Sequence, residues 1–370
     1  MRQELAEGLL GQVMNWERAR LAEERPLLDR MARFKYDEYQ HFAPGRKFVE
    51  NLGLWLNQFK SLAAREAAYA FVKSRLVFVS GAEMRHLVEA GFPDVIRPLL
   101  IRRAATELGL PAHSLSQVMS SSVYRRTQRA SLFLGLSDGA HMDVFRRSAA
   151  LDNEQVWQAY ELSRTKSAGM LSDLRAQVGD DGVFFERVFL VDDFSASGRS
   201  YIRREEDGTW KGKIVKAIRQ FDLPEGEAST LLGPAGDEMF IVLCVATIGA
   251  VTYIRERLLE FFADRPGPAP TVLTVYELPA STALSDDMES DRAFLALVDS
   301  DLYYRERGLD PHEAKGGTES MKRGFAGCAL PVVLAHNCPN NGVFLLWADG
   351  QEAGSARGLF PRVVRHKDTS

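Results

Sequence analysis

The sequence predicts an α/β protein in which a doubly wound parallel sheet follows a mainly helical region. Strand-like and helix-like segments alternate between residues 131 and 277 with short connections, which is typical of a parallel sheet with right-handed crossovers. Apolar residues recur at helical spacing earlier in the chain. We therefore expect a mainly helical N-terminal region over residues 1–110 and an α/β domain over residues 111–370 with a C-terminal hairpin extension.

The N-terminal region is rich in helix-forming residues. Its clearest helical pattern has three- and four-residue steps and consists of Phe48, Leu52, Trp55, Leu56 and Phe59. Pro26 is expected to end or restart an earlier helix, and the apolar run 76–79 is expected to form a short strand. A winged-helix-like module would suit this composition.

A basic bias marks the end of this region and the stretch after it. The arginines concerned are Arg97, Arg102, Arg103, Arg125, Arg126 and Arg129. A solvated helix face is the usual explanation of such a bias, and contact with nucleic acid is the alternative. The formal net charge of −4 gives no general case for nucleic acid or a membrane surface as a partner.

The α/β domain is predicted from the order of its elements. They are strand 131–136, helix 153–178, strand 188–191, helix 200–204 resuming at 213–220, strand 240–247, helix 250–262 and strand 271–277. The run Val188–Val191 is apolar and rich in β-branched residues, as strands buried on both faces are. Such sheets bind ligands at the carboxyl ends of their strands.

The most informative segment follows that run. Asp192 and Asp193 come first, and a loop of small residues with an arginine comes next, formed by Ser195, Ala196, Ser197, Gly198, Arg199 and Ser200. Small residues let backbone N–H groups approach an anion closely, and a following helix would add its positive end. The acids would repel a phosphate but suit a ribose or a hydrated Mg²⁺. An ordinary helix cap is the competing explanation.

This segment resembles the phosphoribosyl pyrophosphate (PRPP) motif of type I phosphoribosyltransferases, with its apolar strand, acid pair and small loop. The resemblance implies that Asp192 and Asp193 hold the ribose hydroxyls at the catalytic centre. It also implies that the loop 195–200 holds the 5′-phosphate and that Mg²⁺ enters bound through PRPP. By order alone, Asp138 and Gly139 take the place of the pyrophosphate-binding loop, although a common Asp-Gly turn explains them equally well.

Two departures from that family bear on catalysis. Ala196 occupies a position where some purine-specific members carry a catalytic Asp, so base catalysis of that kind is not expected. The mobile lid that usually precedes the motif strand is replaced by a mostly helical segment, whose basic and hydroxyl residues cluster at 164–167.

The C-terminal part combines apolar runs with a polar loop. The loop contains His336, Asn337, Asn340 and Asn341, and the runs include Phe344 and Trp347. A β-hairpin with an Asn-built turn explains the pattern; recognition of a base or a phosphate is the alternative. With the motifs above, this segment resembles the phosphoribosyltransferase-like proteins associated with prokaryotic conflict systems, over about residues 36–366. That resemblance implies an effector or sensor role in anti-phage or inter-genome conflict, acting on a nucleotide.

Other chemistry finds little support. The three cysteines are too few and too scattered for a disulfide framework, and the seven histidines have no metal-ligand spacing. Residues 1–10 lack the apolar core of a secretory signal, and the longest apolar run, 239–251, is short for a membrane span. We expect a cytoplasmic protein without a membrane partner.

The leading hypothesis is an enzyme that binds PRPP or a related ribose phosphate and makes or breaks a glycosidic bond. A non-catalytic nucleotide-sensing module on the same fold is the first alternative, and a nucleic-acid-associated protein is the second. The expected partners are a nucleotide or PRPP-like small molecule and a protein from a defence operon; a homodimer stays open.

Overall fold

The computed structural model describes residues 3–42, 45–222, 226–233, 238–304, 309–350 and 356–362. The chain divides into two compact units. Unit 1 comprises residues 1–83 together with 280–370, and unit 2 comprises residues 84–279. This division differs from the boundary expected near residue 110, because the C-terminal segment shares a hydrophobic core with the N-terminal helices.

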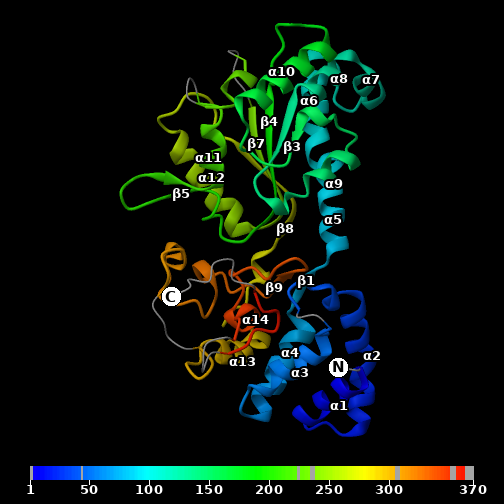
Figure 1. Ribbon diagram of the computed structural model, residues 1–370, viewed down its shortest axis with the longest axis vertical. Helices are drawn as coiled ribbons and strands as arrows, with labels where there is room; N and C mark the ends of the chain where they lie inside the picture. Colours follow the sequence, from blue (N-terminus) through cyan, green and yellow to red (C-terminus); the bar gives the residue numbers. More distant parts are fainter. Residues whose placement is uncertain are drawn as a thin grey trace. The chain divides into compact units, whose positions relative to one another are not determined.

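Unit 2 is built on a parallel sheet of five strands (Figure 1). The strands are β2 (Ser131–Gly135), β3 (Val156–Trp157), β4 (Arg187–Ser195), β7 (Glu238–Thr247) and β8 (Thr271–Leu278). Their order is β3-β2-β4-β7-β8, and every neighbouring pair is parallel. The strand order therefore reverses at β2, with β3 on one side and β4 on the other. The expected α/β class and parallel sheet are confirmed.

Helices and short turns precede the first of these strands and connect the others. They are α5 (Gly81–Ala90), η2 (Gly91–Ile96), α6 (Arg97–Leu108), α7 (Leu115–Ser120), α8 (Ser122–Arg129), η3 (Asp138–Ala140), α9 (Met142–Ser148), η4 (Asn153–Gln155), α10 (Arg164–Val178), α11 (Lys213–Arg219), η5 (Ser229–Leu231) and α12 (Ile248–Phe262). The central strands β4 and β7 are buried along most of their length. That burial explains why both are continuous apolar runs without alternation.

The single helix expected over 153–178 is wrong, because the edge strand β3 lies inside it. Asp152 begins this segment with a capping box, accepting the N–H of Glu154 at 2.8 Å. Val156 then pairs with β2, and α10 begins after its cap, Ser163. A two-residue strand is too short for alternation of polar and apolar residues to reveal it.

The helix expected over 200–204 is also wrong. This stretch leads into an antiparallel hairpin of β5 (Arg203–Arg204) and β6 (Trp210–Lys211). Gly208 provides the turn with a φ of 81°. Gly212 follows with a φ of 127°, and a Cβ there would lie 2.2 Å from the carbonyl oxygen of Tyr201. The helix α11 therefore begins only after Gly212.

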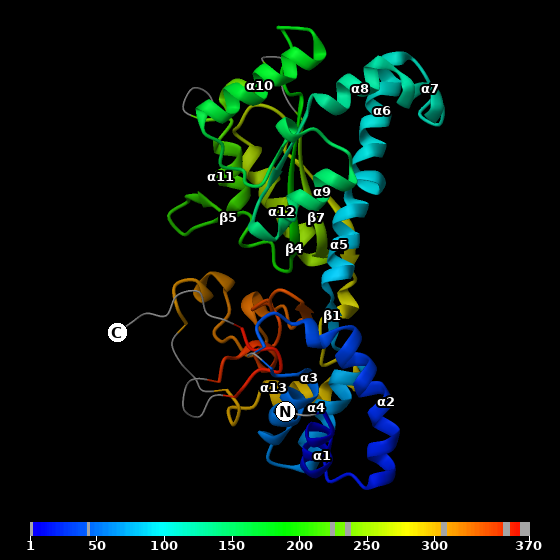
Figure 2. The same cartoon turned by 45° about the vertical axis from the view of Figure 1, so that its right-hand side comes forward.

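Unit 1 joins the two ends of the chain around an aromatic core. Its elements are α1 (Gln3–Val13), α2 (Arg18–Phe34), η1 (Tyr36–Glu38), α3 (Phe48–Asn57), α4 (Leu62–Ser74), β1 (Val77–Val79), η6 (Ala280–Thr282), α13 (Glu289–Val298), η7 (Glu313–Gly316), η8 (Phe325–Gly327), β9 (Val332–Leu334) and α14 (Phe344–Trp347). Figure 2 shows α3, α4 and α13 side by side. Phe71 of α4 stacks on Phe294 of α13 with ring centroids 3.8 Å apart.

Three expectations for unit 1 are corrected. Pro26 lies inside α2, where its exposed position leaves the unbonded helix carbonyl accessible to water. The strand β1, within residues 1–110, pairs in parallel with β9 and not with a strand of a wing. The C-terminal hairpin is replaced by β9, a turn and the short helix α14. Periodicity alone cannot separate a buried strand from a buried helix in such apolar runs.

No helix among the described residues combines the length and the apolar character needed to cross a membrane.

Candidate functional site

The acid pair lies inside β4, near its carboxyl end, because the pairing of β4 with β7 continues as far as Ser195. Successive side chains of a strand point to opposite faces of the sheet. Asp192 and Asp193 therefore have different surroundings, although the sequence suggested one pair with one role.

Asp192 is fully buried and receives hydrogen bonds from three protein donors. Lys213 Nζ lies 2.8 Å from Oδ2, the Tyr201 hydroxyl lies 2.7 Å from the same atom, and the Ser137 hydroxyl donates to Oδ1. Burial raises the pKa of Asp192 above its ordinary value, and the ammonium of Lys213 opposes that shift. These donors stabilise a buried carboxylate that would otherwise be costly.

Tyr201 remains a donor at physiological pH. Its ring is buried, and burial together with the nearby charge of Asp192 raises its pKa well above the ordinary value. The hydroxyl also lies 2.8 Å from the carbonyl oxygen of Phe194, and the Lys213 ammonium lies 5.0 Å from the ring centroid. Tyr201 thus connects the end of β4 with the start of α11.

Asp193 lies against the turn that follows β2. A Cβ built on Gly139 would lie 2.5 Å from Asp193 Oδ2, so only a glycine allows the two segments to approach this closely. Asp193 Oδ1 accepts the N–H of Phe194 at 2.8 Å. Asp138 and Gly139 form η3, so the structure brings the predicted second loop to the acid pair.

The small-residue loop packs against the N-terminal half of α12. Gly198 has a φ of 72°, and a Cβ there would lie 2.9 Å from side-chain atoms of both Tyr253 and Ile254. The Thr247 hydroxyl, which caps α12, donates to the carbonyl oxygen of Ala196 at 2.7 Å. These contacts fix the loop conformation.

Three backbone N–H groups of this loop, those of Ser197, Gly198 and Ser200, have no hydrogen-bond acceptor among the described residues. Arg199 places its guanidinium carbon 5.4 Å from the ring centroid of Tyr253. Ser195 is buried, and its hydroxyl oxygen has no partner within the part of the chain that the structure describes. The unbonded N–H groups make this loop suitable for an anion.

Sequence reasoning missed Ser137, Tyr201 and Lys213. Ser137 and Tyr201 directly flank predicted site segments, and Lys213 opens a helix that the sequence did predict. Nothing in the local pattern indicates that all three point at Asp192. For Ser137 and Tyr201, the only signal in the sequence was that each lies next to a predicted site segment.

The polar loop of the C-terminal segment belongs to unit 1 and serves local structure. Asn341 Nδ2 donates to the Phe325 carbonyl at 3.2 Å, and Trp347 Nε1 donates to the Gly342 carbonyl at 2.7 Å. Phe344 is buried. These contacts give Asn341, Phe344 and Trp347 a structural role.

The family model PRTase-CE matches residues 53–362 of the chain. No curated protein and no solved structure matches it. The matched range contains Asp192, Asp193 and the loop 195–200. The chain belongs to the PRTase-CE family, a phosphoribosyltransferase-like family.

Proposed function

We propose that unit 2 binds PRPP or a related ribose phosphate and makes or breaks a glycosidic bond at its C1′ atom. One observation carries the proposal: two segments far apart in sequence meet at the ends of β2 and β4. Ser137 donates to Asp192, and Gly139 packs against Asp193. The strand order reverses at this point, where α/β sheets bind ligands. The same order supports a doubly wound arrangement.

The loop 195–200 holds the phosphate in this proposal. The N–H groups of Ser197, Gly198 and Ser200 donate to its oxygens, and the positive end of α12 favours the negative charge. Asp193, which packs against Gly139, accepts the ribose hydroxyls. The fixed 5′-phosphate then orients the C1′ atom for reaction.

Asp192 needs an exchange of partners before it contacts a ribose. Its donors are Ser137, Tyr201 and Lys213, and Lys213 is the one that can leave, because its side chain is 33% exposed. In the proposed exchange, the ammonium moves to a ligand phosphate and a ribose hydroxyl takes its place on Asp192. After the exchange, the Lys213 ammonium is paired with the phosphate, and the Asp192 carboxylate still accepts hydrogen bonds from donors.

Mg²⁺ is proposed to arrive with the pyrophosphate of PRPP. Within the described ranges, no group of three or more His, Cys, Asp or Glu side chains is placed to hold a metal ion. Mg²⁺ commonly takes one or two protein carboxylates and completes its shell with water and phosphate oxygens. Asp193 fits that role, and the bound ion would supply positive charge to the departing pyrophosphate.

The family resemblance further supports an effector role in prokaryotic conflict, which we include in the proposal. A specific observation favours the second candidate, a nucleotide-sensing module without turnover. Asp192 already accepts from three protein donors, and Ala196 offers no acid or base to a leaving nucleobase. Such a site could bind its ligand and signal through the release of Lys213.

Calorimetric titration of the full chain with PRPP, with and without Mg²⁺, tests the proposal. We expect binding in the wild type and loss of at least ~10-fold in affinity when Asp192→Asn and Asp193→Asn are combined. The matched control combines Asp180→Asn with Asp181→Asn, an adjacent and exposed acid pair in the same unit. Equal affinities in the two double variants would refute the assignment.

Product analysis of the same samples separates the two candidate functions. Release of pyrophosphate in the presence of Mg²⁺ and a candidate base acceptor indicates transfer. Binding without release of pyrophosphate or base favours the sensing module.

A further inference from the structure

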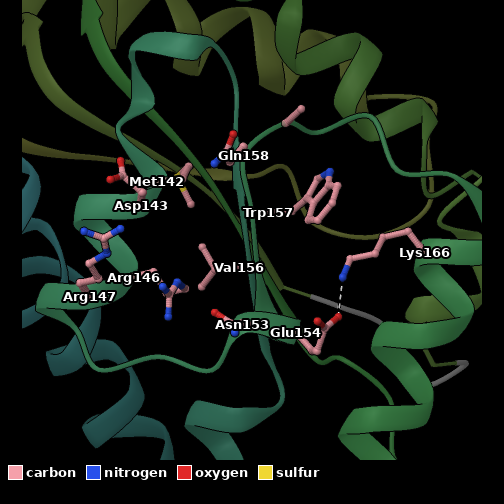
Figure 3. A pocket seen from close by; sticks show the side chains of 11 residues that line it. Met142, Asp143, Arg146, Arg147, Asn153, Glu154, Val156, Trp157, Gln158 and Lys166 are labelled. Atoms are coloured by element: carbon pink, nitrogen blue, oxygen red, sulfur yellow. Dashed lines mark hydrogen bonds and ion pairs between the residues drawn. The ribbon is translucent and has the colours of Figure 1, made fainter.

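A separate pocket lies at the β3 edge of the sheet in unit 2, and none of its lining residues belongs to the site around Asp192 and Asp193. Its volume is ≈ 720 Å³, and small-molecule sites commonly measure about 300–1,000 Å³. Figure 3 shows the pocket lined by side chains of α9, of η4 and β3, and of the first turn of α10.

We propose that this pocket binds a mononucleotide, with its phosphate on the arginines of α9 and its base on Trp157. The site is additional to the ribose phosphate site proposed above and does not depend on it. The two ends of the pocket have different chemistry, and each end supports one half of the ligand.

The α9 end suits a phosphate. Arg146 and Arg147 both line the pocket (Figure 3). Arg147 is exposed, and its side chain forms no hydrogen bond or ion pair with any residue that the structure describes. Among the α9 residues that line the pocket, Arg146 and Arg147 are positive and Asp143 is negative, so this part of the lining carries one positive charge in excess. Asp152 interacts electrostatically with Arg146 but does not line the pocket. A guanidinium can hold two phosphate oxygens at once.

The β3 end suits a flat base. Trp157 has 37% of its surface exposed, and within the described chain no aromatic ring packs on it. The Lys166 ammonium lies 4.6 Å from its ring centroid, and an ion pair with Glu154 holds that ammonium in place. The cation fixes one face of the indole, and the other face can stack on a base.

Polar groups near the indole can recognise the edge of the base. The side chains of Asn153 and Gln158 both line the pocket, and each amide offers a donor and an acceptor. Protection of an exposed sheet edge would explain the nearby charges, because charged residues keep edge strands from pairing. Protection does not explain why one pocket contains both an exposed tryptophan and an arginine whose side chain is unpaired among the described residues.

Calorimetric titration with AMP tests the proposal, in the wild type and in the combined Asp192→Asn and Asp193→Asn variant. We expect AMP to bind the combined variant, since its nucleobase pocket is intact. In that background, Trp157→Ala and Arg147→Ala should each weaken AMP binding by ~10-fold or more. Trp157→Phe should restore most of the affinity, which separates stacking from a folding defect.

Matched controls are Tyr276→Ala, which removes an exposed aromatic side chain from the other edge strand β8, and Arg125→Ala, which removes an exposed arginine of α8. Neither should change AMP affinity. Ribose 5-phosphate, which lacks the base, should bind the pocket at least ~10-fold more weakly than AMP. Absence of AMP binding, or equal losses in the controls, overturns the proposal; failure of PRPP binding alone does not.

Discussion

Two buried carboxylates, one in each unit, make a useful comparison. Asp192 of β4 and Asp291 of α13 both have fully buried side chains, and each is paired with a cation. Lys213 Nζ lies 2.8 Å from Asp192 Oδ2, and Arg75 Nε lies 2.8 Å from Asp291 Oδ1. Burial and pairing alone therefore do not distinguish a functional carboxylate from a structural one.

The cations differ in their freedom to leave. Arg75 also donates to the carbonyl oxygen of Ser281 at 3.0 Å, and its side chain is 17% exposed. Asp291 additionally accepts the N–H of Ser285 at 3.2 Å, so the pair ties η6 and its following loop to the helices of unit 1. Lys213 has a flexible, 33% exposed side chain that reaches Asp192 near the carboxyl end of the central strand β4. Two features therefore distinguish the candidate site: Asp192 lies near the carboxyl end of β4, and its cation, Lys213, can leave.

The largest expected effect is that of Arg75→Met, which should destabilise unit 1 by about 3–5 kcal/mol because it leaves Asp291 buried without its cation. Hydrogen exchange of unit 1 peptides in increasing urea measures the change. The control is Arg33→Met, which removes an exposed pair with Asp29 and should cost about 0–1 kcal/mol. If both variants lost a similar amount of unfolding free energy, the buried pair of Arg75 and Asp291 would have no special structural role.

A smaller effect is expected for Lys213→Met, about 1–3 kcal/mol near neutral pH. Asp192 keeps Ser137 and Tyr201 as donors and can take up a proton. Because burial raises the pKa of folded Asp192, folding favours its protonated form. The contribution of this group to the free energy of unfolding is therefore fully present below the unfolded pKa of about 3.8. That contribution is lost as the pH rises through the folded pKa.

Removal of the Lys213 charge should raise the pKa of Asp192 further and steepen this loss of stability above pH 4. Denaturant unfolding of unit 2 at a series of pH values measures it, with Lys216→Met, an exposed lysine of the same helix, as the control. A profile parallel to that of the wild type would show that Lys213 does not control the protonation of Asp192.

The smallest effect is expected for Gly139→Ala, a ~10-fold loss of PRPP affinity, equivalent to about 1.4 kcal/mol. The added Cβ would lie 2.5 Å from Asp193 Oδ2 and would push η3 away from the acid pair. Gly169→Ala is the control, because a Cβ on this α10 glycine meets nothing within 4 Å. If PRPP affinity were unchanged in both variants, η3 would not be part of the ligand site.

The sequence predicted the parts of unit 2 that local patterns encode. Apolar runs identified β2, β4 and β7, a further strand was expected at β8, and alternation with helices identified a parallel sheet. The Asp192–Asp193 pair and the loop 195–200 stood out because acids and small residues directly follow a buried strand. The family model that confirms membership covers residues 53–362, a range that includes these residues.

Local patterns could not reveal contacts between distant segments. Pairing of β1 with β9 joins the two ends of the chain into unit 1, in a register of Val77 with Val332. The strand β3 is too short to produce a pattern, and the side chains of the pocket at that edge come from four separate elements.

The sequence by itself determined four of the five strands of the sheet, and it placed two acids and a loop suited to an anion one after the other near the end of β4. Only the tertiary structure decided that Asp192 faces Ser137, Tyr201 and Lys213 while Asp193 faces Gly139. The physical reason is that periodicity and propensity act over a few residues, whereas the surroundings of a buried charge depend on which distant segments pack around it.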